Sequence, residues 1–130
     1  MKIAYPIFLA PVENGAYVVS IPDFKNYTEG KDLADAMSMA RDAISLLGVS
    51  MEDRGQALPE PSDISSLTPE APFTVPALID VDFDAYRRAN DKKTVRKSVT
   101  VPGWLNVEAE KAGLNFSQVL TEGLRIRLGF

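Results

Sequence analysis

The last thirty-five residues, 96–130, restrict the possible fold more than any other part of the sequence. They begin with a short strand, 96–101, whose side chains alternate between a polar face and a more apolar face. The polar face carries Arg96, Ser98 and Thr100, and the other face carries Lys97, Val99 and Val101. Pro102 follows the strand, and its fixed φ and missing N–H suit the first turn of a helix.

Two short helices are predicted after this proline. The first is marked by apolar residues at helical spacing and by a glycine suited to a helix end. These residues are Leu105, Ala109, Ala112 and Gly113. Asn115 or Ser117 can cap the second helix with a side-chain oxygen, and Gln118 stands three residues after Asn115. One apolar stripe on the second helix is formed by Phe116, Leu120, Leu124 and Leu128.

A single strand and two helices of this size cannot bury a core alone, and the strand has no partner within the segment. Two chains solve both problems if they pair their strands antiparallel and pack their helices together. This is the ribbon-helix-helix (β-α-α) arrangement, whose two-stranded ribbon enters the major groove of DNA. The expected dimer core consists of Val99, Val101, Leu105, Leu120 and Leu124. The alternative is a strand and helical hairpin that complete the sheet of one monomeric domain.

The polar face of this strand offers candidate contacts to DNA bases. Arg96 can pair with guanine, and Ser98 or Thr100 can contact several base edges. Basic residues suited to phosphate or long-range attraction are Lys92, Lys93 and Lys97. The N-terminus of the last helix, from Asn115 to Ser117, can offer backbone N–H groups to a phosphate. The alternatives are an exposed polar face that contacts no base and simple capping of the helix.

Charge is distributed unevenly along the chain, which has a net charge of −4. Residues 1–85 hold five Lys/Arg and fourteen Asp/Glu, whereas residues 86–130 hold nine Lys/Arg and four Asp/Glu. This asymmetry favours two modules with different partners. The basic module suits a polyanion such as DNA, and the acidic module suits a basic protein.

The residue types that are missing exclude several kinds of chemistry. The chain has no cysteine and no histidine, so disulfides, thiolate metal sites, Ser-His-Asp and Cys-His nucleophiles and His-based zinc sites are ruled out. Only carboxylate chemistry with a divalent ion stays open to an enzyme. No apolar run is long enough for a membrane helix and no signal-peptide pattern is present, so we expect a cytoplasmic protein without a cofactor.

The first part of the chain is predicted to be a small α+β layer in the order β-β-β-α-β, followed by a short helix. Ranges with strand patterns are 2–9, 17–21, 23–29 and 73–81, and ranges with helical patterns are 32–48 and 84–90. Glu13 to Gly15 form a hairpin turn signal, and Asp32 can cap the long helix, with Gly48 as its candidate end. Pro6 predicts that the first strand lies at an edge or begins with a free side.

Three alternating carboxylates mark the end of the last expected strand of this layer. Asp80, Asp82 and Asp84 could hold Mg²⁺ if carboxylates from other elements converged on them, with Asp23 and Glu29 as the tempting additions. The plainer interpretation is a solvated strand end followed by a helix cap, and we favour it. We therefore expect no catalytic residue and no metal site.

Aromatic residues supply the candidate contacts to a protein partner. Phe24 and Tyr27, beside Asp23, could anchor such a partner, and they could equally belong to the core under a loop. Trp104 follows the predicted ribbon directly and is expected to pack at the junction between ribbon and helix rather than to stack on nucleic acid.

Nearly the whole chain resembles the HicB family of bacterial antitoxins. The most specific stretch is I-D-V-D-F-D-A-Y-R-R-A-N-D-K-K-T-V-R-K-S-V-T-V-P-G-W-L-N, residues 79–106, continued by A-G-L-N-F-S-Q-V-L, residues 112–120. The resemblance implies a toxin-binding domain like a truncated RNase H fold without nuclease activity, then a DNA-binding domain. It also implies a partner, the HicA toxin, a small basic ribonuclease. Family members block this toxin and repress their own operon.

We therefore predict a non-enzymatic antitoxin and operon autorepressor that acts as a dimer. Its expected parts are a toxin-binding domain at 1–89, a linker at 90–95 and a ribbon-helix-helix domain at 96–130. One alternative is a stand-alone repressor whose N-terminal domain senses a small ligand. Another is a divalent-metal nuclease with an RNase H-like site.

Overall fold

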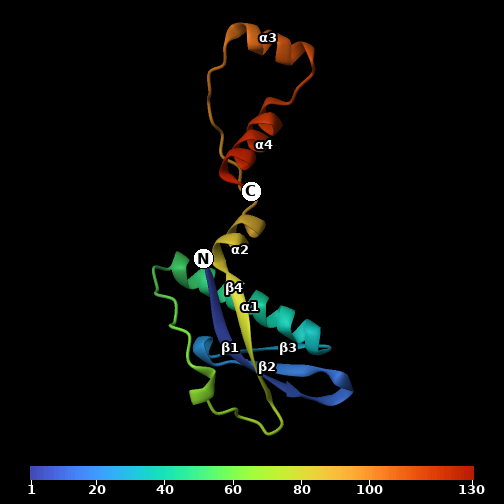
Figure 1. The fold of residues 1–130 in the computed structure, drawn as a ribbon, viewed down its shortest axis with the longest axis vertical. Coiled ribbons are helices and arrows are strands. Elements are labelled where there is room, and N and C mark those ends of the chain that lie inside the picture. Colours follow the sequence, from blue (N-terminus) through green and yellow to red (C-terminus); the bar gives the residue numbers. More distant parts are fainter. The chain divides into compact units, whose positions relative to one another are not determined.

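The computed structural model describes residues 1–130 and divides into two compact units, 1–92 and 93–130 (Figure 1). The N-terminal unit is a four-stranded antiparallel sheet with helices, and the C-terminal unit is a pair of helices preceded by an exposed segment without regular secondary structure. No helix in either unit is both long enough and apolar enough to cross a membrane.

The sheet of the N-terminal unit has the strand order β3-β2-β1-β4. Its strands are β1 (Lys2–Pro11), β2 (Tyr17–Ile21), β3 (Asn26–Gly30) and β4 (Val75–Asp82). The predicted turn at Glu13–Gly15 is confirmed and joins β1 to β2. Asn14 and Gly15 have φ values of 61° and 77°, the left-handed conformation that asparagine and glycine tolerate best.

The first strand lies in the middle of the sheet but begins with one free side, so the second of the two placements predicted from Pro6 is confirmed. β1 pairs with β4 from Lys2 to Leu9, but its pairing with β2 begins only at Phe8. Pro6 therefore lies in the half of β1 that is paired on one side, where its missing N–H breaks no bond to β2. The second proline, Pro76, lies in β4, which is an edge strand.

Helix α1 (Leu33–Asp53) begins at the predicted cap but runs past its predicted end. The Asp32 carboxylate accepts a hydrogen bond from the backbone N–H of Asp35 at 2.7 Å. Gly48 does not end the helix, which continues to Asp53. Gly48 is instead packed against the ring of Phe83, where a side chain would not fit.

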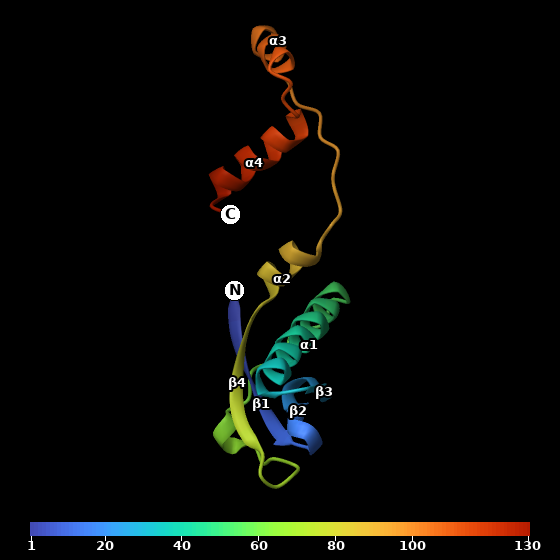
Figure 2. The same cartoon turned by 90° about the vertical axis from the view of Figure 1, so that its right-hand side faces the viewer.

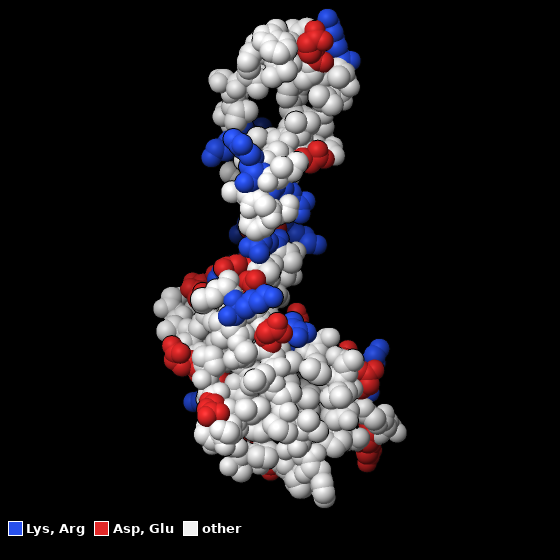
Figure 3. Space-filling model, viewed as in Figure 1, with Lys and Arg blue, Asp and Glu red and all other residues white.

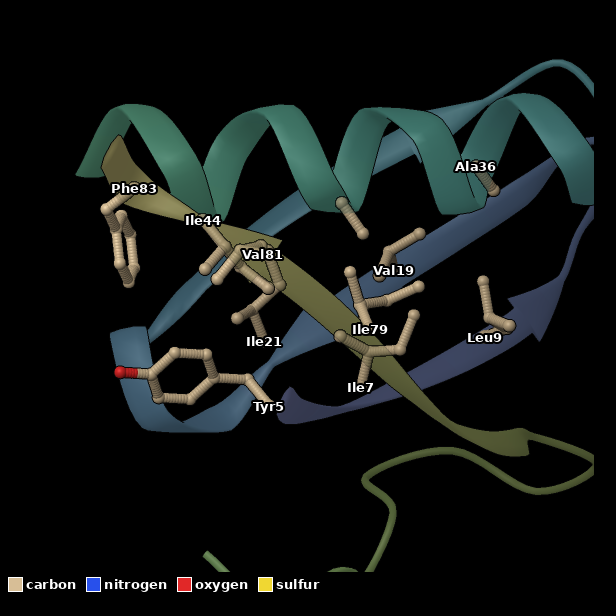
Figure 4. Close-up of a cluster of buried hydrophobic side chains, with 11 residues drawn as sticks. Tyr5, Ile7, Leu9, Val19, Ile21, Ala36, Ile44, Ile79, Val81 and Phe83 are labelled. Carbon is tan, nitrogen blue, oxygen red and sulfur yellow. The ribbon is translucent and has the colours of Figure 1, made fainter. Parts of the chain in front are cut away.

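The core lies between α1 and one face of the sheet, and Figures 2 and 4 show these two layers. It is built from alternating strand residues and from the helix stripe. Its fully buried members are Tyr5, Ile7, Leu9, Val19, Ile21, Ala36, Ala40, Ile44 and Ile79. The predicted inward faces of β1 and β2 are confirmed by this arrangement.

The opposite face of the sheet is partly covered by the segment between α1 and β4. On the core side, the same segment is held by the Tyr5 hydroxyl, which donates a hydrogen bond to the carbonyl oxygen of Pro59 at 2.9 Å. Phe8 points away from α1 and is nevertheless buried, and Leu67 of the segment lines a cavity beside it. The segment thus shields the middle of this outer face, and its turn at Ile64–Ser66 also approaches β4, while Leu78 of β4 stays exposed.

Helix α2 (Phe83–Asn90) follows β4 directly and is held against the C-terminal end of α1. Arg87 donates to the Asp53 carboxylate at 2.9 Å and to Glu52 at 3.4 Å. These contacts attach the last helix of the unit to its long helix, and the predicted short helix at this position is confirmed.

The C-terminal unit contains α3 (Gly103–Lys111) and α4 (Phe116–Leu128). The predicted glycine end of α3 is confirmed, because Gly113 has a φ of 68° and its N–H donates to Glu110. The Asn115 side chain caps α4 by accepting from the N–H of Gln118 at 3.1 Å. The predicted strand at 96–101 has no backbone pairing within the chain.

Candidate functional site

The residues predicted to contact DNA all lie on exposed surface of the C-terminal unit or just before it. Arg96, Ser98 and Thr100 belong to an exposed segment that makes no strand pairs within one chain. The lysines predicted to approach phosphates, Lys92, Lys93 and Lys97, are exposed in the same segment. This arrangement leaves the basic and hydroxyl side chains accessible to a polyanion.

The N-terminus of α4 is occupied in part by its own cap. The Asn115 side-chain oxygen accepts the hydrogen bond from Gln118, so this oxygen serves the helix. Ser117 is exposed in the first turn. The capping expected of Asn115 is thereby confirmed, and a phosphate contact at this end stays a prediction.

The apolar side chains of the C-terminal unit are not buried within the chain. Val99, Val101, Leu105, Leu120 and Leu124, the predicted dimer core, are all exposed, and α3 and α4 contain no buried residue. A wholly apolar hollow of about 210 Å³ lies between the helices. Its lining consists of Val101, Leu105, Asn106, Ala109, Leu114, Phe116 and Val119. Such an open apolar surface on so small a unit indicates a partner that covers it.

Trp104 is also exposed, at the start of α3. The packing expected for it at a ribbon–helix junction therefore does not occur within one chain. That contact would need the paired ribbon of a second copy.

Two of the three residues predicted to contact a protein partner serve the fold of the N-terminal unit. The Asp23 carboxylate accepts hydrogen bonds from the backbone N–H and the hydroxyl of Ser62, at 2.9 Å for the former. The ring of Phe24 packs edge-on against Tyr5, with 4.9 Å between ring centroids. Both side chains fasten the segment between α1 and β4 to the sheet, the arrangement expected of a core under a loop.

Tyr27 is the exposed member of this set. Its hydroxyl donates to both oxygens of Glu70, at 2.8 and 2.7 Å, and this hydrogen bond raises the pKa of the tyrosine. The pair borders a cavity of about 280 Å³ on the outer face of the sheet, next to Phe8. Burial is the main cause that raises the pKa of Tyr5 on the other side of the sheet.

The three carboxylates at the end of β4 each have a partner within the chain. Arg41 of α1 donates to the Asp80 carboxylate at 3.1 Å and lowers its pKa. The N–H of Ala85 donates to Asp82, which caps α2, and this bond lowers the pKa of Asp82. The Met1 amine lies 2.9 Å from Asp84. No group of three or more acidic side chains in the chain is placed to hold a metal ion.

The additions considered for a metal site do not join these carboxylates. Asp23 is bonded to Ser62, and Glu29 lies on β3, at the opposite edge of the sheet from β4. A cavity of about 510 Å³ near Asp80 is lined by residues of both charges. These include Lys2, Arg41, Asp42, Asp80 and Asp82. The arrangement neutralises charge within the unit and offers no convergent catalytic set.

Two exposed apolar residues near β4 were missed by the sequence reasoning. Phe73 was expected inside a strand, but it lies in a turn before β4 with a φ of 60° and is 89% exposed. Leu78 lies in β4 on the face away from the core and is 57% exposed. The dipeptide Pro72-Phe73 could have signalled a turn, because proline at the second turn position is common.

The fold and the open apolar surface are typical of a small protein that acts by binding partners. Comparisons with known proteins identify its family. The family model described as HicB_like antitoxin of bacterial toxin-antitoxin system matches residues 5–122. The chain therefore belongs to the family of HicB-like antitoxins, and the resemblance seen in the sequence is confirmed.

Solved structures share the fold. A chain from a toxin–antitoxin complex of Streptococcus pneumoniae is 24% identical, with a TM-score of 0.61, over 98% of this chain and 99% of that one. The antitoxin HicB of Burkholderia pseudomallei is 21% identical, with a TM-score of 0.55, over 98% and 97%. Its N-terminal domain is 26% identical, with a TM-score of 0.56, over 62% and 99%. No curated protein matches the chain.

Proposed function

We propose that this chain neutralises a HicA-type toxin through its N-terminal unit and represses its own operon through a dimeric C-terminal unit. Membership of the antitoxin family carries the first part of the proposal. A solved structure described as a HicA3 and HicB3 toxin–antitoxin complex contains a chain that aligns with 62% of this one, at a TM-score of 0.51. The proposed toxin partner follows from that family relationship.

Charge supports the division of labour between the units. Residues 1–92 hold eight Lys/Arg and fifteen Asp/Glu, and residues 93–130 hold six Lys/Arg and three Asp/Glu. An acidic unit attracts a basic ribonuclease and repels nucleic acid, whereas a basic unit does the reverse. On this proposal the N-terminal unit is a relative of the RNase H fold that binds a nuclease without being one.

The exposed apolar surface of the C-terminal unit supports a dimer. Strands 96–101 of two copies would pair antiparallel, which satisfies the backbone groups that one chain leaves unpaired. Val99 and Val101 would then turn inward onto Leu120 and Leu124, and the hollow between α3 and α4 would be covered. This is the ribbon-helix-helix arrangement, in which residues 96–101 would make the strand pairing that one chain alone cannot make.

The same pairing would direct Arg96, Ser98 and Thr100 outward on the ribbon. A two-stranded ribbon fits the major groove, where arginine can donate two hydrogen bonds to guanine. Lys92, Lys93 and Lys97 would approach the phosphates. A repressor of its own operon needs both kinds of contact, because phosphate contacts position the protein and base contacts select the sequence.

The test is to express the toxin of the same operon in bacteria with and without this chain. We expect growth arrest by the toxin alone, rescue by the chain, and binding of the purified chain to DNA from its own promoter. A chain that binds the promoter but neither binds nor neutralises the toxin would be the stand-alone repressor instead. Failure in both assays would contradict the proposal as a whole.

A further inference from the structure

We propose that the toxin docks at the β4 edge of the sheet, with Phe73 in the turn before β4 and Leu78 on the outer face of β4 as apolar anchors on an acidic unit. The inference rests on the proposed toxin-binding function and names the surface that performs it. It also replaces Asp23 and Phe24, which serve the fold, as the centre of that surface. The partner is a basic protein.

Phe73 is the first observation behind this proposal. A large aromatic ring that is 89% exposed packs against little of the unit and adds almost nothing to its stability. Its backbone is left-handed, with a φ of 60°, at the third position of a turn after Pro72. Glycine or asparagine fits that position, and a bulky side chain there is strained. A strained, exposed aromatic residue is typical of a binding site rather than of a stabilising turn.

Leu78 is the second observation. It pairs with Pro6 in the register of β4 and β1, and it points to the face opposite the buried Ile79. β4 has no strand on its other side, so the backbone next to Leu78 is open as well. Neighbouring exposed residues on the same face that extend this apolar area are Ala4 and Pro76.

The two anchors are close enough for one partner to cover. Phe73 precedes Leu78 by five positions, which is at most roughly 16 Å at the usual strand rise. An ordinary interface of about 800 Å² per partner spans that distance. An apolar centre with a polar rim is also the usual composition of such an interface.

Charge complementarity selects a basic partner over a second copy of this unit. Several carboxylates near the anchors have partners within the chain, such as Asp80 with Arg41, but the whole unit, 1–92, keeps a net charge of −7. Figure 3 shows this side of the N-terminal unit, with uncharged atoms at its centre and both acidic and basic side chains nearer its margin. Two copies of this acidic unit would repel each other, whereas a basic protein would be attracted to it.

The experiment measures binding of the operon's toxin to the full-length chain and its variants. Leu78→Arg places a cation and a long side chain in the apolar centre, and we expect the Kd to rise by tenfold or more. The matched control is Leu46→Arg on the exposed side of α1, where the leucine is 55% exposed. We expect this control to change the Kd by less than threefold.

Phe73→Asn is a second variant, and its expected loss of binding cannot be attributed to a folding defect. Asparagine tolerates the left-handed backbone, so the variant should unfold at a higher temperature than the wild type. It lacks the aromatic anchor, so the same variant should bind the toxin at least tenfold more weakly. A merely structural role for Phe73 predicts that stability and binding change in the same direction.

The outcomes separate this inference from the function on which it rests. A wild-type chain that does not bind the toxin contradicts the proposed function and this surface with it. If the wild type binds and the Leu78 and Phe73 variants bind equally well, the function stands and the surface is wrong. A loss of binding confined to Leu46→Arg moves the toxin to α1 and overturns the inference. The inference is also overturned if Leu78→Arg lowers the mass of the assembly in sedimentation but leaves toxin binding unchanged.

Discussion

Gly48 of α1 lies directly against the buried ring of Phe83, the first residue of α2, and the space between them is too small for a methyl group. Glycine weakens a helix interior by roughly 1 kcal/mol relative to alanine. Here the chain keeps glycine because the helix backbone and the ring approach each other so closely.

Gly48→Ala should therefore destabilise the N-terminal unit despite the better helix propensity of alanine. Overpacking in a core costs typically about 1–3 kcal/mol, which exceeds the gain in propensity. Chemical denaturation of the full chain, followed through the unfolding of its N-terminal unit, measures the change. Phe83→Leu should lower stability alone but lower it less in combination with Gly48→Ala, because leucine leaves room for the methyl group. Simple additivity of the two changes would mean that the contact is not the cause.

Leu124→Ala should weaken the proposed dimer. If Leu124 is fully buried between two copies, its truncation costs about 2–5 kcal/mol through reduced transfer energy and a residual cavity. Sedimentation of the full chain across a concentration series measures the shift toward monomer. Ile126→Ala is the matched control on the same helix, because Ile126 is more exposed and lies outside the stripe of Leu120 and Leu124. Equal effects of the two substitutions would place the interface elsewhere.

Arg96→Ala should lower binding to the promoter operator more than binding to a random duplex. A bidentate arginine–guanine pair contributes about 1–3 kcal/mol of discrimination. Lys92→Ala should lower both affinities alike and reduce the slope of the salt dependence by roughly 1 for each phosphate that the protein no longer neutralises. Affinities of both variants for both duplexes across a salt series give the answer. A uniform decrease for Arg96→Ala would show that the polar strand face does not contact the bases.

Asp80 should titrate below the ordinary aspartate range because Arg41 stabilises its charged form. Because the pKa is lowered, the pair stabilises the folded state at any pH above the unfolded-state pKa of about 4. This stabilisation is lost as the pH falls through the lower pKa of the folded state. Carboxyl NMR titration of the wild type and of Arg41→Met measures the shift. We expect the Asp80 pKa to return toward its ordinary value in the variant, and an unchanged pKa would assign the shift to another group.

Local chemistry made several elements of the fold predictable. The turn at Glu13–Gly15, the Asp32 cap, the Gly113 helix end and the Asn115 cap each depend on residues within four positions of one another. Periodicity of apolar residues likewise located the inward faces of the strands and helices. Such signals are visible in the sequence because the atoms that satisfy them are close along the chain.

Interactions between distant parts of the chain were not predictable in the same way. Gly48 looked like a helix end, but it lies beside Phe83, thirty-five positions later. The sequence left open whether Phe24, beside Asp23, contacts a partner or the core, and only the fold showed that Ser62 and Tyr5 contact these two residues. Pro6 indicated an edge strand or a free side, and only the pairing with β4 decided for the free side.

The sequence by itself determined that this chain has an acidic and a basic part, that the basic part cannot bury a core alone, and that it resembles HicB antitoxins. Tertiary structure decided which carboxylates are neutralised internally and which apolar side chains face outward, because both depend on long-range packing. It placed Phe73 and Leu78 on the surface beside an open strand edge. The predicted strand at 96–101 is set neither by the sequence alone nor by the fold of one chain, because its backbone would be paired only by a second chain.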